Sequence, residues 1–182
     1  MMALYRATLI GLALLWAQSA SAAVLLDKSE IRFICKQMGA PVEGRFKHFD
    51  ADVVFKPTDL LHSHAKISID LASIDLASDE SETEVKGKNW FNVTHFPQAV
   101  FQSTSIKALG GENYEVHGHL ALKGVTQDIV VPMKIHTLSG MQVAEGSYAL
   151  MRTVFKIGEG TWADPDTVAE EVAVKFKMIL AP

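Results

Sequence analysis

The sequence has 182 residues, of which 48% are hydrophobic, and its 17 Lys and Arg against 21 Asp and Glu residues give a formal net charge of −4. This length suits one domain with a sizeable core, and no Pro- or Ser-rich stretch resembles a linker between two cores. The acidic balance argues against the basic surface that nucleic-acid binding needs, so no nucleic acid is expected as a partner.

The N-terminal 22 residues have the three-part organisation of a secretory signal. Arg6 is their only charge, the apolar run Leu9 to Ala17 is too short to span a bilayer, and Ala20-Ser21-Ala22 forms a small-x-small cleavage site. We predict cleavage of this signal peptide before Ala23, export to the periplasm, and a mature domain over residues 23–182. Removal of Arg6 leaves 16 basic against 21 acidic residues, a net charge of −5. The shortness of the apolar run disfavours the alternative, an uncleaved N-terminal anchor.

Period-two alternation of apolar and polar residues dominates the rest of the chain. In Val172 to Leu180, for example, every second residue is apolar, which is typical of a half-buried strand. Short turns separate most of these segments, so neighbouring strands should be antiparallel. In chain order the predicted strands are Ile31 to Met38, Val42 to Phe55, Lys66 to Leu71, Ala99 to Lys107, Tyr114 to Leu122, Ile129 to Ile135, Met141 to Lys156 and Val172 to Leu180.

One short helix is predicted within Ser78 to Gly87. Ser78 is a good N-terminal cap, acidic residues follow it in the first turn, Lys86 stands in the last turn, and Gly87 ends the segment. The helix belongs to Ser73 to Pro97, the longest insertion between two strands.

These elements predict an all-β domain with one short helix. Two architectures bury one face of about eight strands, namely two packed sheets or one sheet closed on itself. In either architecture, Pro132 inside a strand needs an edge or a bulge. Gly44 and Gly118 lie in phase with inward apolar residues, where a missing side chain leaves space or permits sharp coiling. These two glycines favour a barrel with a cavity.

Cys35 is the only cysteine, so no internal disulfide can form. It shares a strand face with Ile31 and Phe33, which indicates a small buried apolar residue. A reactive thiol is the alternative, although no His or Cys neighbours Cys35 in sequence to lower its pKa.

No motif specifies a metal site or a catalytic centre. His62 and His64, like His117 and His119, have a spacing that some zinc sites use, but no third ligand is specified for either pair. The second pair lies on the strand face opposite Val116 and should point to solvent. No Gly-x-Ser-x-Gly motif is present. We therefore predict no metal, no cofactor and no catalytic residue.

Residues 86–103 are unusually aromatic for a stretch that Gly, Asn and Pro mark as a connection. Together with other short motifs they carry a family resemblance. The motifs are, in order, Gly44-Arg45-Phe46 with Phe49-Asp50, Trp90-Phe91-Asn92 with Phe96-Pro97, Phe101, Ser103, Gly118 to Thr126, and Phe155 to Gly158. From Ser29 to Leu180 the chain resembles the YceI-like family of exported isoprenoid-binding proteins.

The resemblance implies an extended antiparallel eight-stranded β-barrel, similar to lipocalins in shape, whose lumen holds a long isoprenoid lipid. It places Trp90, Phe91 and Phe96 at or under the barrel wall, where an aromatic ring either plugs the core or contacts a ligand. Many relatives carry a His where this sequence has Gln37, which can form hydrogen bonds but cannot carry charge.

Inward apolar residues are expected to bind the isoprenoid tail in a tunnel of ~20 to 25 Å, which follows from strands of about nine residues that rise ~3.3 Å each and are tilted. The predicted ligand-binding residues are Phe33, Phe46, Trp90, Phe91, Phe96, Phe101, Val116, Leu120 and Phe155.

Three functions from different classes fit this sequence. The first is a periplasmic carrier for a polyprenyl phosphate or a long-tailed quinone, with no covalent chemistry. The second is an enzyme that acts on the head group, with Gln37, Lys123 and Arg152 as polar candidates at the mouth, although such residues are more often ordinary rim residues. The third is an interaction protein with a filled core that works beside a membrane redox partner. Transient membrane contact fits the carrier, and the oligomeric state is open, with a homodimer among the options.

Overall fold

The structure is a computed structural model that describes residues 24–181. The predicted signal peptide and its cleavage site lie outside the described residues. Ten strands are present among the residues described: β1 (Glu30–Gln37), β2 (Ala40–Phe46), β3 (Phe49–Val54), β4 (His64–Asp70), β5 (Ile74–Asp75), β6 (Gln98–Gly110), β7 (Asn113–Leu122), β8 (Val125–Leu138), β9 (Met141–Met151) and β10 (Glu171–Leu180). The helices are α1 (Asp79–Lys86) and the short 3-10 turns η1 (Leu26–Lys28), η2 (Leu60–His62), η3 (Leu71–Ser73), η4 (Arg152–Phe155) and η5 (Gly160–Trp162).

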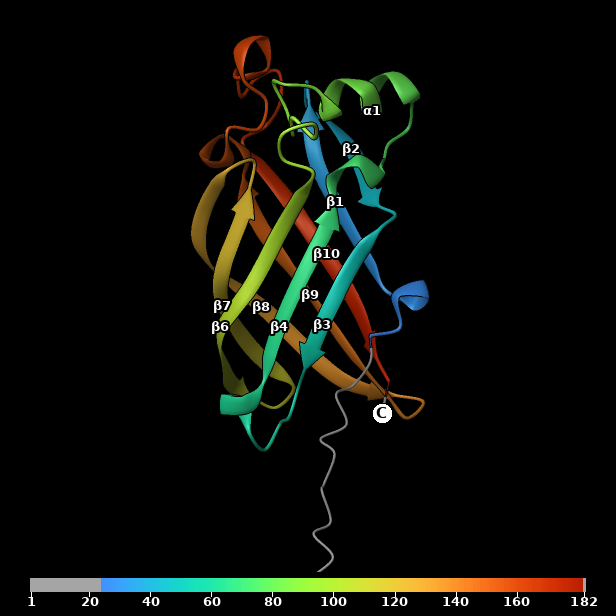
Figure 1. Ribbon diagram of the computed structural model, residues 1–182, viewed down its shortest axis with the longest axis vertical. Coiled ribbons are helices and arrows are strands. Elements are labelled where there is room, and N and C mark those ends of the chain that lie inside the picture. The colour runs from blue at the N-terminus through green and yellow to red at the C-terminus, as the bar shows by residue number, and fades with distance from the viewer. Residues whose placement is uncertain (1–23, 182) are drawn as a thin grey trace, which may run out of the picture.

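All ten strands belong to one sheet in the order β3-β4-β6-β7-β8-β9-β10-β1-β2-β5, and each adjacent pair is antiparallel. The sheet curls about its long axis into a half-barrel with β3 and β5 as its two end strands (Figure 1). The all-β fold with one short helix is thus confirmed. The prediction of a closed eight-stranded barrel is wrong in its strand number and in its closure.

One of the two extra strands is β5, within the predicted insertion, and the other arises because the chain bends where one long strand was predicted over Val42 to Phe55. Phe46 and Phe49 both face the inside of the sheet, three residues apart, which an uninterrupted strand with its two-residue alternation cannot achieve. At the bend between them, the backbone N–H groups of Lys47 and His48 donate to the carbonyl and the hydroxyl of Ser73, each at 3.0 Å. These bonds hold β2 and β3 in different directions.

The last long hairpin also departs from its predicted bounds. β9 ends at Met151, and the residues that alternation assigned to the same strand, Arg152 to Phe155, form the turn η4. β8 pairs with β9 only from Met133 onward, and Pro132, which has no N–H to donate, lies just outside that ladder. Pro132 was expected at an edge or a bulge, and it lies where the β8–β9 ladder stops, which is a local edge within the sheet.

Helix α1 has the boundaries that its sequence predicts. Ser78 is the N-terminal cap and its hydroxyl accepts a hydrogen bond from the Ser81 N–H at 3.2 Å, while Gly87 is the C-terminal cap. Glu82 and Lys86 form a side-chain pair at 3.2 Å one turn apart. No helix among residues 24–181 combines the length and the apolar character needed to cross a membrane.

Candidate functional site

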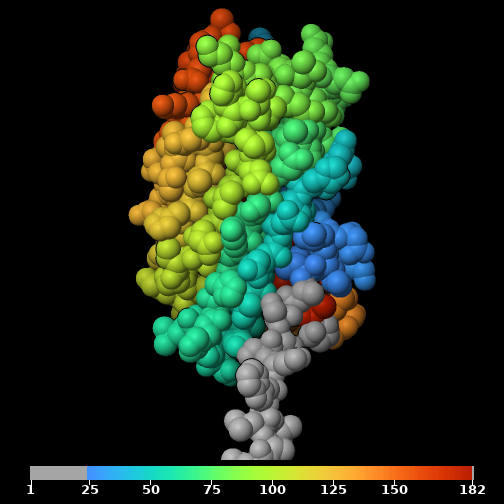
Figure 2. Space-filling model, in the orientation of Figure 1, coloured from blue at the N-terminus to red at the C-terminus, as the bar shows by residue number. Residues whose placement is uncertain are grey.

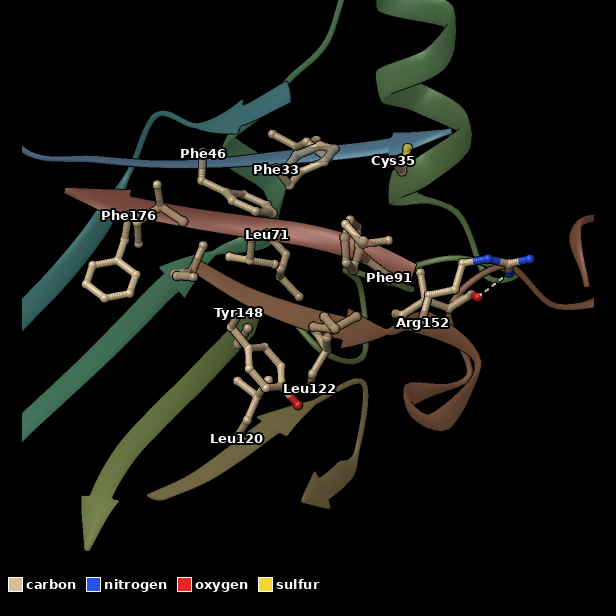
Figure 3. A pocket seen from close by; sticks show the side chains of 18 of the residues that line it. Phe33, Cys35, Phe46, Leu71, Phe91, Leu120, Leu122, Tyr148, Arg152 and Phe176 are labelled. Atoms are coloured by element: carbon tan, nitrogen blue, oxygen red, sulfur yellow. Dashed lines mark hydrogen bonds between the residues drawn. The ribbon is translucent and has the colours of Figure 1, made fainter. Parts of the chain in front are cut away.

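The inward faces of the strands enclose a cavity of about 820 Å³. It extends along the sheet, because Val172 at the start of β10 and Leu180 at its end both line it. Its wall is almost entirely aliphatic and aromatic, and Figure 3 shows Phe33, Phe46 and Leu120 among the side chains that point into the shared space. An apolar cavity of this size falls in the range of ligand-binding pockets, which is roughly 300 to 1,000 Å³.

Three glycines keep this cavity open, because each lies under an aromatic ring from the neighbouring strand. The pairs are Phe33 with Gly44, Phe101 with Gly118, and Phe176 with Gly146. At Gly118 a Cβ atom would lie 2.7 Å from the Phe101 ring and 2.4 Å from the carbonyl oxygen of Gln102. The missing side chain thus lets the ring lie against the wall instead of filling the lumen. The expectation that inward glycines accompany a cavity is confirmed.

Helix α1 and the segment 152–169 cover one end of the cavity, which we call the mouth. Residues from Asp79 to Val85 line the cavity although none of the helix is buried. On the opposite side Trp162 donates its indole N–H to Glu84 Oε1 at 2.7 Å, and its ring packs on Trp90 with the ring centroids 5.6 Å apart. The two covering segments lie at the same end of the molecule in Figures 1 and 2.

Arg152 fixes one side of the mouth and has no exposed surface. Its Nε, Nη1 and Nη2 donate to the carbonyl oxygens of Ile157, Gly158, Ala163, Val168 and Ala169 at 2.7 to 3.5 Å. A guanidinium has five N–H donors, and all are used here. The segment after β9 leaves the sheet with its carbonyls unpaired, and Arg152 satisfies them. A hydrogen bond of the Arg152 guanidinium is drawn in Figure 3.

Lys123 fixes the same segment from outside the cavity. It lies in the β7–β8 turn, its side chain is 6% exposed, and its Nζ donates to the Lys156 carbonyl at 2.6 Å and to Glu159 Oε2 at 2.8 Å. The ion pair with Lys123 lowers the pKa of the Glu159 carboxyl. Asn89 contributes its carbonyl to the N–H groups of Gly158 and Glu159.

Two groups in the cavity wall titrate abnormally. Burial raises the pKa of the Cys35 thiol, and the nearby positive charge of Arg152 offsets only part of that rise. Burial also raises the pKa of the Tyr148 phenol. Both groups therefore stay protonated near pH 7, so neither adds a negative charge to the lumen.

The structure brings seven of the nine predicted ligand-binding residues to the cavity. They are Phe33, Phe46, Trp90, Phe91, Phe101, Val116 and Leu120. Phe96 instead packs on the β7–β8 turn, where its ring would lie 2.9 Å from a Cβ at Gly124. Phe155 is 2% exposed but packs behind the wall with Leu122 and Ile157. Both rings support the mouth rather than line the lumen.

The three polar candidates for head-group chemistry do not converge. Gln37 and Arg152 line the cavity, but Gln37 is exposed at the end of β1, and all donors of Arg152 are engaged. Lys123 does not line it. The expectation of ordinary rim residues was wrong for Lys123 and Arg152, because both are buried and organise backbone carbonyls.

The His pairs lie away from the cavity. His119 is exposed and bonds to Asp128, and His62 bonds to Asp59. His117 is only half-buried, on the outer face of β7. Within residues 24–181, no cluster of three or more His, Cys, Asp or Glu side chains could hold a metal ion.

Several cavity residues had a sequence signal that was not assigned to the site. Phe176 and Val174 alternate in β10, and Tyr148 and Leu150 alternate in β9, so their inward direction was predictable. The cover formed by α1 had no such signal, because all of its lining residues except Val85 are polar and are typical of a solvated helix face.

Comparisons of sequence find relatives that match part of this chain. A UPF0312 protein of Yersinia pestis (strain Pestoides F) is 34% identical over 106 residues, which are 58% of this chain and 55% of that protein. A UPF0312 protein of Azotobacter vinelandii is 30% identical over 128 residues, 67% of each chain. The chain thus spans about half the length of the Yersinia relative.

Solved structures share the fold over most of the chain. BcnA of Burkholderia cenocepacia is 38% identical, with a TM-score of 0.83, and the match covers 86% of this chain and 98% of BcnA. A polyisoprenoid binding domain from Saccharophagus degradans, implicated in plant cell wall breakdown, is 15% identical with a TM-score of 0.72, and the match covers 89% of this chain and 99% of that domain.

The likeness to the Saccharophagus domain concerns the fold, since its sequence identity is low. The family assignment comes from the YceI-like domain, which matches residues 23–180 and so includes nearly all the strands and turns that enclose the cavity. The chain belongs to the YceI-like family.

Proposed function

We propose that this protein binds a long isoprenoid lipid in its cavity and carries it without covalent chemistry. The observation that carries the proposal is the cavity itself, about 820 Å³ within the half-barrel, with a wall of aliphatic and aromatic side chains. The family assignment supports it, as does the isoprenoid binding stated for the Saccharophagus domain.

The size and chemistry of the cavity suit a hydrocarbon tail. If each chain carbon takes roughly the ~30 Å³ that one water takes in the liquid, the cavity of about 820 Å³ holds on the order of 27 carbons, or about five isoprene units. Relative to water, burial of a few hundred Å² of tail at ~25 cal/mol per Å² contributes several kcal/mol, which suffices to hold the lipid in aqueous solution. A longer tail would have to fold or to leave the mouth.

The charges at the mouth favour an uncharged head group. Among the described residues that line the cavity, the acidic side chains Asp79, Glu80 and Glu84 come from α1, and the only basic side chain is Arg152. Because Arg152 already donates all its N–H groups to carbonyls, it has none left for a phosphate. We therefore favour a long-tailed quinone over a polyprenyl phosphate, with a periplasmic location and transient membrane contact as parts of the same proposal.

The proposal is tested by native mass spectrometry of protein purified from its own host, followed by solvent extraction and identification of the extracted lipid. After delipidation, binding of a long-chain quinone and of a polyprenyl phosphate of equal tail length is measured. We expect both to bind, the quinone more tightly.

A pair of variants separates the lumen from the surface. Leu120→Gln places an amide in the lumen and should weaken quinone binding about tenfold or more, whereas Val130→Gln on the outer face of β8 should leave it unchanged. If the wild type binds neither lipid, or if folded Leu120→Gln keeps full affinity, the carrier is the wrong function and an interaction protein becomes the better one.

A further inference from the structure

On the side of β3, β7 and β8, the cavity stops before the end of the half-barrel that lies opposite the mouth, whereas Leu180 at the end of β10 still lines it. Val53 and Met133 line it, but Phe55 and Ile135, two residues further along the same inward faces, do not. Phe55 and Ile135 are each 7% exposed and belong to the same buried cluster as the cavity wall. The space below Val53 is therefore filled by side chains that belong to the protein.

A folded connection holds Phe55 in that position. The β3–β4 connection, residues 55–63, closes on itself because the Ser63 hydroxyl accepts the Lys56 N–H at 2.9 Å and donates to the Asp59 carbonyl at 3.1 Å. Ser63 is 8% exposed although it lies in a loop. In Figures 1 and 2 this connection lies at the end opposite α1. The chain therefore turns under the barrel and carries the Phe55 ring with it.

The Phe55 ring is fixed by a second aromatic residue. Tyr114, at the start of β7, meets it edge to face, with ring centroids 5.0 Å apart and the planes at 86°. Neither residue lines the cavity, while Val116, two residues further along β7, does. The aromatic pair is thus the floor that the lower end of a bound tail would meet.

We propose that Phe55 and Tyr114 set the greatest tail length that fits in the cavity. This inference rests on the proposed isoprenoid binding and adds a specificity determinant to it. The eight steps from Val172 to Leu180 on β10 span ~26 Å of strand, or ~20 Å along the axis of a tilted sheet, so a tail that enters at the mouth reaches the floor after that distance.

The floor can be lowered or raised by substitution. Phe55→Ala removes a ring of roughly the size of one isoprene unit and should lengthen the preferred tail by about one unit. Ala144 lines the cavity and pairs with Ile135 of the floor, so Ala144→Leu should fill space above the floor and shorten the preferred tail. Phe101→Ala in the side wall is the matched control, because it should weaken binding of all lengths without moving the preferred length.

The experiment uses delipidated full-length mature protein and an equimolar ladder of polyprenols that differ by one isoprene unit, with the occupancy of each length read by native mass spectrometry. We expect a drop in occupancy beyond one length in the wild type, moved to longer tails in Phe55→Ala and to shorter tails in Ala144→Leu. Should Phe55→Ala not fold, Phe55→Leu and Tyr114→Leu lower the floor more gently.

The outcomes distinguish this inference from the proposed function. If the wild type binds polyprenols but shows no length limit, or if folded floor variants keep the wild-type limit, Phe55 and Tyr114 do not set the tail length. If the wild type binds no polyprenol of any length, the proposed function is wrong, and the inference about tail length is wrong with it.

Discussion

The two ends of the half-barrel are closed in different ways. At the floor, Phe55 and Tyr114 close the lumen by apolar packing. At the mouth, Arg152 and Lys123 organise a long connection through hydrogen bonds to its backbone carbonyls. Apolar packing can fill a gap where two strands end in a short loop, but a longer connection brings many backbone polar groups that need partners. On the proposed function, the mouth is the end at which the lipid exchanges, whereas the floor stays packed.

The largest difference between the ends should appear when Arg152 is replaced. Arg152→Met leaves buried carbonyls without donors and should lower the free energy of unfolding by roughly 3 to 5 kcal/mol, measured by urea denaturation. Limited proteolysis should cut the variant within residues 152–169. Arg152→Lys keeps the charge but offers fewer donors, so an intermediate loss is expected. An unchanged free energy of unfolding in Arg152→Met would mean that the hydrogen bonds of Arg152 do not stabilise the mouth.

The wall between the two ends should resist the addition of one methyl group. A Cβ at Gly118 meets the Phe101 ring and the Gln102 carbonyl, so Gly118→Ala should destabilise the protein by about 1 to 3 kcal/mol and push the ring into the lumen. A double-mutant cycle separates the two contacts, because the ring clash is gone in Phe101→Ala while the carbonyl clash remains. Additive effects of the two substitutions on the free energy of unfolding would contradict the role given to the ring.

A smaller effect is expected at the contact between the two covering segments of the mouth. Trp162→Phe removes the hydrogen bond to Glu84 but keeps a ring against Trp90, so stability should change by no more than about 1 kcal/mol. Lipid transfer to acceptor vesicles should become several-fold faster because α1 is less firmly held. Val130→Gln, on the exposed outer face of β8 and outside the cavity lining, is the control. Equal transfer rates in wild type and Trp162→Phe would rule out α1 as the barrier.

The smallest effect concerns the thiol in the lumen. Because burial raises the pKa of Cys35, the thiolate fraction at any pH below that pKa is smaller in the folded than in the unfolded protein. Alkylation by iodoacetamide at pH 8 should thus be slower for native than for urea-unfolded protein, and should accelerate as the pH rises above the ordinary thiol pKa. A bound tail should slow it further. A native rate equal to or above the unfolded rate would indicate an activated thiol.

The features that were predictable from sequence are those that a local pattern specifies. Alternation assigns the inward face of β10 and so identifies Phe176, and the capping pattern of Ser78 and Gly87 locates α1. The resemblance to the YceI-like family supplied the cavity's expected occupant, which alternation alone does not.

The remaining features depend on where strands end and on distant partners. The resemblance placed Phe155 at the ligand, but the chain leaves the sheet at Met151 and the turn η4 carries the ring behind the wall. The bend at Lys47 depends on Ser73, which is distant in sequence. The floor was missed because alternation says which residues face inward but does not say at what height the lumen is already filled. For that reason Phe55 and Phe101 look equivalent in the sequence.

The strand β10 has a consequence for the order of folding. It lies between β9 and β1, and its Ile179 N–H donates to Ser29 Oγ at 3.0 Å across 150 positions of sequence. Such distant pairing is slow, because the entropy of closing a long loop is lost before any contact is gained. The lumen has no wall on this side until that step is complete. If the protein binds a lipid as proposed, the lipid can slow the unfolding of the finished protein but has no cavity to bind while the early strands assemble.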